Sequence, residues 1–405
     1  MNEENDFWLV RRPPGAVEKG NAGASHVLSV IVADLLALAP VEDVEALFRK
    51  GCACRDGNGV PEDHAEAVKW LRMAAESGHA GAQFWLGTYY GVGLIVPLDY
   101  EQSVRWKRMA AEQGYANAQN SLGICYQNGD GVPQDYKQAV HWYRKAAGQG
   151  QAEAQSSLGW CYENGRGVPQ DYKQAVRWYR KAAEQGALAA QTNLAAYYLI
   201  GRGVPQDYEQ AVHWGRKAAE KENESAQCRL GYCYEEGKGV ARDYEQALYW
   251  YRKAAEKGYA GAQFYLGNCY EYGHGVTQDY ERAIYCYRTG AEQGDPFSQV
   301  SLGNCYDEGK GIAQDFAQAV NWYRKATEQG NEFGQDALGV CCQFGKGISQ
   351  DFCEAYKFYK MALDGKNIAA AGKLEVLKKR MTSEEIIEGE RRYREFKVTT
   401  KNPGI

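Results

Sequence analysis

One sequence pattern recurs along this chain every 36 residues. Its most regular member is a leucine, which holds the same place in eight successive repeats, whereas Lys50 takes that place in the first. The leucines are Leu86, Leu122, Leu158, Leu194, Leu230, Leu266, Leu302 and Leu338. A repeat of this length is typical of solenoids, in which each unit buries its apolar face only against its neighbours. The sequence therefore predicts one continuous array of repeats.

Each unit holds two amphipathic helical patterns joined by a glycine-rich loop. In one unit, Ala118 and Leu122 are four residues apart, as on one face of a helix, and Gly129 is expected to end this first helix. Asp135 is expected to cap the second helix, with Gln138 as its partner in a capping box. The expected fold is all-α: a right-handed α-α superhelix (solenoid) of about nine helix hairpins with capping helices at both ends.

The repeats also define the expected domains. These are a flexible N-terminal segment (1–19), divergent N-terminal capping helices (20–46), nine repeats (47–370), C-terminal capping helices (371–396) and a flexible tail (397–405). Residues 26–40 are apolar, but Asp34 interrupts the run and acidic residues precede it, which favours a capping helix over a signal peptide. At the other end, Thr382 and Glu385 predict a capping box. The apolar residues expected to cover the last open face are Ile386, Ile387, Tyr393 and Phe396.

Three motifs carry a resemblance to a known family. They are Ala-x-x-x-Leu-Gly-x-x-Tyr in the first helix, Gly-x-Gly-Val-x-x-Asp in the loop and Ala-x-x-Trp-Tyr-x-x-Ala-Ala in the second helix. Repeated in phase over about residues 47–370, they resemble the Sel-one-like repeat (SLR) family, a relative of the tetratricopeptide repeats. The segment from Met381 looks like the helix that often ends bacterial members. The resemblance implies a scaffold or adaptor that binds other proteins or peptides without catalysis.

Some units depart from the pattern. Ile95 stands where the second loop glycine is expected, so its turn is predicted to differ from the others. Glu222 replaces the glycine that ends a second helix, and Ala195 replaces a helix-packing glycine. Cys286 takes the place of a tryptophan. We expect irregular joints at Ile95 and Glu222.

Composition narrows the range of partners. The net charge is −5, so no basic stripe suited to a phosphate backbone is expected. No run approaches the roughly 18 apolar residues that would span a bilayer. We therefore expect neither a nucleic-acid partner nor a membrane span, and we expect a monomer.

Six of the twelve cysteines share one repeat position. They are Cys125, Cys161, Cys233, Cys269, Cys305 and Cys341. Equivalent positions in adjacent units are expected about 10 Å apart. A disulfide needs Cα atoms within roughly 7 Å, and zinc needs its ligands within about 2.3 Å of the metal. We expect buried free thiols in a cytoplasmic protein without metal or cofactor, although export by a non-classical route stays open.

Two other functions remain open at this stage. The secreted, cysteine-rich branch of the resembled family includes proteins that bind or hydrolyse β-lactams. That branch carries a cysteine pair in each unit, at places held here by residues such as Ala182-Ala183 and Ala190-Gln191. The third possibility is a structural protein that assembles with itself through an exposed terminal face.

The outward side of the first helices is the candidate binding surface. Its residues differ from unit to unit, whereas the inward stripe, such as Ala82, Leu86 and Tyr90, hardly changes. By analogy with related solenoids this side lines a concave groove, where aromatic and amide side chains suit recognition of an extended segment or a helix. The candidate partner-binding residues are Phe84, Trp85, Trp160, Tyr232, Phe264, Tyr265, Asn268, Tyr272, Asn304 and Phe344.

Two further expectations concern this surface. Several of the aromatic residues could instead only pack against adjacent units. Acidic residues near the same helix ends predict a basic or mixed-charge partner. These acids are Glu163, Glu235, Glu236, Glu271, Asp307 and Glu308.

Overall fold

The computed structural model describes residues 43–401, and every regular element in that part of the chain is a helix. The first helices of the hairpins are α2 (Val44–Asp56), α4 (Ala80–Val92), α6 (Ala116–Asn128), α8 (Ala152–Asn164), α10 (Leu188–Ile200), α12 (Glu224–Glu236), α14 (Ala260–Tyr272), α16 (Pro296–Glu308) and α18 (Glu332–Phe344). The second helices are α3 (His64–Glu76), α5 (Tyr100–Glu112), α7 (Tyr136–Gly148), α9 (Tyr172–Glu184), α11 (Tyr208–Glu220), α13 (Tyr244–Glu256), α15 (Tyr280–Glu292), α17 (Phe316–Glu328) and α19 (Phe352–Asp364). Two helices follow, α20 (Ala369–Lys378) and α21 (Ser383–Lys401).

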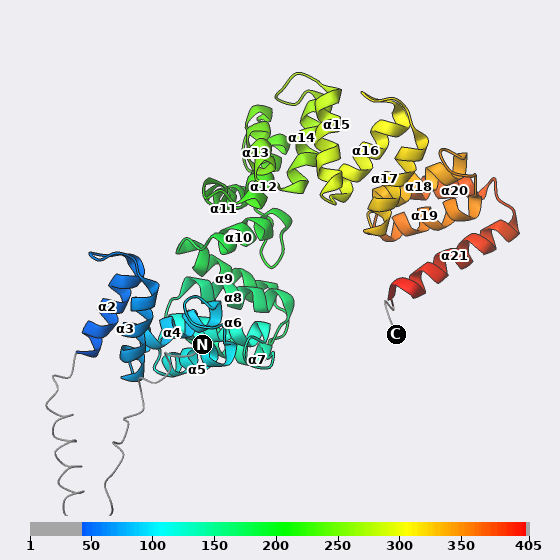
Figure 1. The fold of residues 1–405 in the computed structure, drawn as a ribbon. Helices are drawn as coiled ribbons and strands as arrows, with labels where there is room; N and C mark the ends of the chain where they lie inside the picture. Colours follow the sequence, from blue (N-terminus) through cyan, green and yellow to red (C-terminus); the bar gives the residue numbers. More distant parts are fainter. Residues whose placement is uncertain (1–42, 402–405) are drawn as a thin grey trace, which may run out of the picture. The chain divides into compact units, whose positions relative to one another are not determined.

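The chain divides into two compact units, residues 1–134 and 135–405, and each is described by itself. In the first unit, α2 to α6 pack in chain order. In the second unit, α7 to α19 do the same, and α20 and α21 both pack against α19 (Figure 1). Each unit is therefore a stretch of α-solenoid. The expected flexible segment 1–19 and most of the expected capping region 20–46 lie outside the described residues.

Glycine and aspartate set the ends of the helices, as the sequence predicts. Gly165 ends α8 in the left-handed conformation (φ 64°), and its N–H donates to the Cys161 carbonyl. Asp171 caps α9 by accepting the N–H of Gln174 at 3.0 Å. The reciprocal half of the expected capping box is replaced, because the Asp171 N–H donates to the Tyr162 carbonyl of α8 at 2.9 Å. That bond ties the loop back onto the first helix.

Within a hairpin, a buried tyrosine of the second helix packs flat on a glycine of the first. In α8 and α9 these are Tyr179, which is fully buried, and Gly159. A Cβ on Gly159 would lie 2.8 Å from the Tyr179 ring, closer than packed atoms can approach. The same contact joins Gly267 to Tyr287, where the distance would be 2.4 Å. The glycine therefore sets how closely the two helices approach.

Between hairpins, a buried glutamine and an arginine link each second helix to the next first helix. The Gln155 amide of α8 donates to the Ala147 carbonyl of α7 at 3.3 Å. The Arg144 guanidinium of α7 donates to the Tyr162 hydroxyl of α8 at 3.0 Å. Both contacts recur elsewhere in the chain. The glutamine bond is buried and satisfies polar groups that would otherwise be unpaired.

The C-terminal helices cover the last hairpin only in part. The capping box at Thr382 and Glu385 forms in both directions, at 2.8 and 3.2 Å. Tyr393 is buried and its hydroxyl donates to Asp364 at 2.6 Å, while Ile386 packs against the last core cluster. The expectation was wrong for Ile387, which is 70 % exposed, and for Phe396, which is also exposed, because neither side chain is buried against the last hairpin.

The two irregular joints keep the regular backbone. Ile95 has φ 69°, close to the 70° of Gly131 at the same loop place, and Glu222 has φ 64°, in the same left-handed region as Gly186 (90°) and Gly258 (83°) at its own repeat position. The expectation of a different turn at Ile95 was therefore wrong. The hydrogen bonds around the loop impose the left-handed conformation on side chains that rarely adopt it, which stores strain of about 1–3 kcal/mol at each site.

The glycine–tyrosine contact yields a prediction about stability. Gly267→Ala should destabilise the chain by about 1–3 kcal/mol, because its Cβ must displace the buried Tyr287 ring. The matched control is Gly148→Ala in α7, where no atom lies within 4 Å of the added Cβ. The control should be neutral or stabilising by up to about 1 kcal/mol. Thermal melts followed by circular dichroism test both, and equal melting temperatures for the two variants would contradict this packing role.

Candidate functional site

The sequence-predicted site residues lie on first helices in both compact units, so they do not form one described site. In the first unit, Phe84 and Trp85 of α4 contact each other edge-on, with ring centroids 5.1 Å apart. The Arg55 guanidinium lies 3.8 Å from the Trp85 ring centroid, and the Tyr115 ring lies 5.5 Å from that of Phe84. Both side chains are half-buried, so much of their surface is used in packing.

In the second unit, the structure brings three predicted residues together around one pocket. Tyr232 of α12 and Phe264 and Tyr265 of α14 line a hollow of about 370 Å³ with residues of α10 and α16. The Tyr265 ring stacks on Tyr251 at 4.9 Å, and Phe264 meets Tyr265 edge-on at 5.1 Å. We call this hollow the α12–α14 pocket.

An aromatic row extends from this pocket across the next two first helices. We define it as Phe264, Phe297 and Phe333, whose ring centroids are 5.6 and 6.3 Å apart in turn. Phe297 is 43 % exposed and Phe333 is 47 % exposed. Sequence reasoning missed both. A comparison of the repeats could have found them: Phe297 and Phe333 occupy the same repeat position, and the earlier units carry Gly261 or another small or polar residue there.

The remaining predicted residues lie apart from the pocket. Trp160 of α8 is half-buried beside Tyr136. Tyr272 and Phe344, at the ends of α14 and α18, are 61 % and 55 % exposed. The amide oxygen of Asn268 accepts a hydrogen bond from the Tyr287 hydroxyl at 2.7 Å, and that of Asn304 accepts one from the Tyr323 hydroxyl at 2.8 Å. Each of these amide oxygens is therefore already engaged within its hairpin.

The acids near the first-helix ends are also engaged within the chain. The buried Tyr179 hydroxyl donates to Glu163 at 2.6 Å, and that of Tyr251 donates to Glu235 at 2.7 Å. Burial and the neighbouring carboxylate both raise the pKa of each of these tyrosines. The hydroxyls therefore stay protonated and act as donors.

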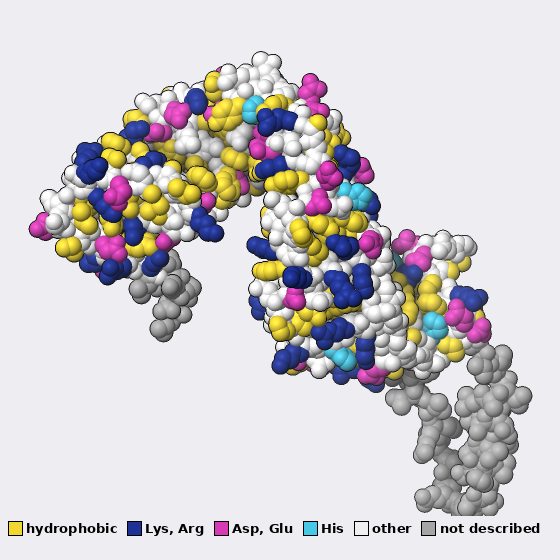
Figure 2. Space-filling view, turned by 180° about the vertical axis from the view of Figure 1, so that it is seen from behind, with side chains coloured by type: hydrophobic (Ala, Val, Ile, Leu, Met, Phe, Trp, Pro, Cys, Tyr) yellow, Lys and Arg dark blue, Asp and Glu magenta, His cyan; other side chains and the backbone are white. Residues whose placement is uncertain are grey.

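The same repeat position forms ion pairs with a base 39 residues later. The pairs are Glu235 with His274 (3.4 Å), Glu271 with Lys310 (3.1 Å) and Asp307 with Lys346 (3.1 Å). Glu236 and Glu308 also lie near lysines, at 3.9 and 3.1 Å. Figure 2 shows acidic and basic side chains interspersed with apolar patches on the face drawn. Most of these acids are thus engaged by groups of the chain itself, and the expectation of a basic or mixed-charge partner stays a prediction.

The fifth hairpin, α10 and α11, departs from this arrangement through coupled changes. Gly215 stands where other second helices carry the packing tyrosine. Tyr197 of α10, in the place of the repeated cysteine, is buried and lies 5.9 Å from Tyr179. Ala195 replaces the first-helix glycine, and a Cβ on Gly215 would lie 3.8 Å from it. Leu199 replaces the acid, and this hairpin has no second-helix tyrosine hydroxyl that would need an acceptor there.

The row of ion pairs starts at Glu235, one repeat after Leu199. Lys238 is the base 39 residues after Leu199, and without an acid there it contacts the Tyr232 hydroxyl. Its Nζ lies 4.5 Å from the Tyr232 ring centroid and 3.9 Å from Glu236. The α12–α14 pocket thus lies at the start of this row, and Leu199 forms part of its wall.

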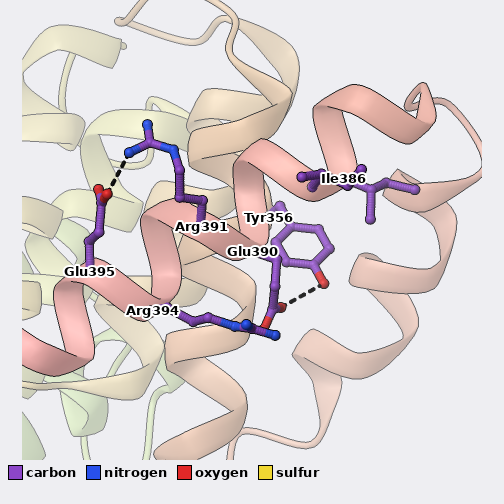
Figure 3. Close-up of a pocket in the computed structure, with 7 residues that line it drawn as sticks. Tyr356, Ile386, Glu390, Arg391, Arg394 and Glu395 are labelled. Carbon is purple, nitrogen blue, oxygen red and sulfur yellow. Dashed lines mark hydrogen bonds and ion pairs between the residues drawn. The ribbon is translucent and has the colours of Figure 1, made fainter.

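Two other hollows occur in the second unit. One, of about 860 Å³, lies along α21 between Tyr356 and Ile387 (Figure 3). There the Tyr356 hydroxyl contacts Glu390 at 3.1 Å, and Arg391 pairs with Glu395 at 2.5 Å. Its charged groups are therefore paired with one another.

The other hollow, of about 400 Å³, lies where Cys286 replaces a tryptophan. In other hairpins this tryptophan lies under a lysine, as with Trp322 and Lys325 at 3.9 Å. In this unit Thr289 replaces that lysine as well, so ring and cation are lost together. The hollow therefore results from a missing internal contact.

The thiols are placed for packing. All twelve cysteines are free, and nine of them are buried. Burial raises the pKa of Cys269 and Cys305 to about 12. Within residues 43–401, no three His, Cys, Asp or Glu side chains are placed to hold a metal ion. The nine buried thiols thus lack the exposed, electropositive surroundings of reactive cysteines.

Comparison with known proteins identifies the family. The Sel1 repeat model matches nine times, at residues 44–79, 80–115, 116–151, 152–186, 188–223, 224–259, 260–295, 296–331 and 333–367. The chain is an α-solenoid repeat protein, and it belongs to the Sel1 repeat family. A search of curated protein sequences finds no match.

Two solved bacterial structures support this assignment. A protective antigen present in uropathogenic Escherichia coli strains, displaying an SLR fold, is 35 % identical over 87 % of this chain and 84 % of that one, with a TM-score of 0.62. A Sel1 repeat protein from Oxalobacter formigenes is 32 % identical over 84 % of this chain and 95 % of that one, with a TM-score of 0.57. Sel1 repeat proteins are generally protein-interaction scaffolds. None of the described helices is long and apolar enough to cross a membrane.

The thiol environments yield a second prediction. At pH 8 a thiol reagent such as 5,5′-dithiobis(2-nitrobenzoate) should react quickly only with the half-buried Cys52, Cys54 and Cys353. The buried thiols should react only after unfolding, because a raised pKa leaves almost no thiolate at pH 8 and burial blocks access. Absorbance of released thionitrobenzoate, with mass-spectrometric mapping, reports the sites. Rapid native labelling of Cys269 or Cys305 would contradict the burial described.

Proposed function

We propose that this chain is a non-catalytic scaffold that binds an extended peptide or protein segment along the outward side of the first helices α12 to α18. The observation that carries the proposal is the aromatic row, three rings in sequence on neighbouring first helices with two of them more than 40 % exposed. Exposed aromatic side chains in a row beside a pocket are typical of recognition surfaces.

The repeated residues of the hairpin have a different role, in packing, and this contrast supports the assignment. Acids, tyrosines and glutamines at most of the repeated positions hold helices together. Phe297 and Phe333 take no part in those hydrogen bonds, and their repeat position varies from unit to unit. A preformed surface of this kind binds an extended ligand at low cost in protein ordering.

Partner capture tests the scaffold function. The double substitution Phe297→Ala and Phe333→Ala should reduce partner capture by about tenfold or more, since aromatic truncation at the centre of an interface costs roughly 2 kcal/mol or more. The control is Tyr285→Ala, which removes a 71 % exposed ring from the second helix α15. Affinity purification with quantitative mass spectrometry compares them. Equal loss in the control, or no loss in the double variant, would contradict the assigned surface.

Self-assembly through the end of the array is a second candidate, favoured by the exposed Ile387 beside the hollow along α21. If it operates, sedimentation velocity should show a species that grows with protein concentration. Ile387→Glu should remove that species, because a charge on an apolar contact is costly to bury. A single monomer boundary across about a hundredfold range of concentration would reject this candidate.

A further inference from the structure

We propose that the α12–α14 pocket binds a peptide segment in which an apolar side chain stands next to a carboxylate. The proposal rests on the scaffold function and specifies the chemistry of its ligand. Four features carry it: the apolar wall, an unpaired cation, an apolar residue at the place of a repeated acid, and the continuation of the pocket into the aromatic row.

The walls of the pocket suit an apolar side chain. Leu199, Tyr232, Phe264 and Phe297 line it from four successive first helices, α10, α12, α14 and α16. A hollow of about 370 Å³ is at the lower end of ligand sites, which generally hold about 300–1,000 Å³. It therefore fits one or two side chains of a bound segment.

The polar groups of the pocket suit an anion. Among the described residues, the Arg229 guanidinium has no hydrogen-bond or ion-pair partner. The hydroxyls of Tyr259 and Tyr265, which also line the pocket, likewise have no partner in the described part of the chain. Asp295, the acid of the lining, keeps its charge, but its carboxylate is held at the N-terminus of α16, where it accepts the Ser298 N–H at 2.6 Å and the helix dipole stabilises it. Unsatisfied donors thus predominate, and a carboxylate satisfies an arginine in a planar, charge-assisted pair.

The pocket opens where the repeated arrangement is absent. At the place of Leu199, the next three units carry acids that would repel a bound carboxylate. At the place of Gly261, the next two units carry Phe297 and Phe333, whose rings would fill the hollow. A Cβ on Gly261 would already lie 3.2 Å from the Tyr259 ring. Two departures from the repeat therefore combine to make room and to remove negative charge.

The aromatic row gives the bound segment a path beyond the pocket. Phe264 belongs to both, and Phe297 and Phe333 continue from it toward α18 at ring spacings of 5.6 and 6.3 Å. Two residues of an extended chain span about 6.6–7 Å. Alternate side chains of the segment can therefore meet successive rings, while the carboxylate lies at Arg229.

Three substitutions test the pocket with little disturbance of the fold. Leu199→Glu restores the acid that other units carry at this position. The new carboxylate should form an ion pair with Lys238, as Glu271 does with Lys310. Gly261→Phe introduces the side chain that the next two units carry at the same position. Arg229→Gln removes the cation alone. The matched control is Arg177→Gln on α9, an exposed arginine without a recorded partner in the described residues.

Fluorescence anisotropy of labelled peptides on the full chain provides the measurement. The probe is a peptide of about twelve residues with repeated Phe-Asp pairs in a Gly/Ser background, compared with Phe-Asn, Phe-Lys and Gly-Asp versions. The Phe-Asp probe should bind at least about tenfold more tightly than each of the others. Each of the three pocket variants should weaken it at least tenfold, whereas the control should bind as the wild type does. Circular dichroism confirms that each variant is folded.

The outcomes separate this inference from the scaffold function. No selective binding of the Phe-Asp probe, or unchanged binding by folded Arg229→Gln and Leu199→Glu variants, would overturn the ligand chemistry. If partner capture still depended on Phe297 and Phe333, the scaffold function would stand while this inference failed. If capture did not depend on those rings, the scaffold surface itself would be rejected. Equal binding of Phe-Lys and Phe-Asp would show that the rings alone select the ligand, and would also overturn the inference.

Discussion

Each regular hairpin of this solenoid depends on a second-helix tyrosine that packs on a first-helix glycine. Gly159 and Tyr179 show the contact, which leaves no room for a Cβ. Because the ring lies flat on the helix, its hydroxyl reaches the acid near the end of that helix, as Tyr251 reaches Glu235. The acid then pairs with a base of the next hairpin. One packing contact thus determines the spacing within a hairpin and the polar link to its neighbour.

This dependence explains why the changes in the fifth hairpin occur together. Gly215 removes the second-helix ring, the buried Tyr197 ring packs on Tyr179 of the preceding hairpin, and Leu199 stands where an acid would have no tyrosine donor. A change made for packing therefore alters the outward surface. The α12–α14 pocket follows from this alteration, so its apolar character has a cause in the internal packing of the solenoid.

Much of the fold could be predicted from the sequence, because the period, the capping aspartates and the helix-ending glycines are local signals. The left-handed backbone at Ile95 could not be predicted, because the loop's hydrogen bonds override the preference of an isoleucine for negative φ. The balance of charge at Glu271 was also hidden, because its partner Lys310 lies 39 residues away. Of the candidate site, the structure brings the predicted Tyr232, Phe264 and Tyr265 together around one pocket. The sequence did not single out Arg229, because its lack of a hydrogen-bond or ion-pair partner depends on neighbours that only the fold brings together. The assignment of all these residues to partner binding stays a prediction.

The proposed scaffold function requires the first-helix surface of α12 to α18 to contact the partner. Hydrogen–deuterium exchange on the full chain, with and without a purified captured partner, tests it directly. Bound partner should slow exchange in peptides that cover α12, α14, α16 and α18 and leave α13, α15 and α17 at their free rates, because the segment rests on the first helices alone. Protection confined to the second helices, or to α21, would contradict the claim.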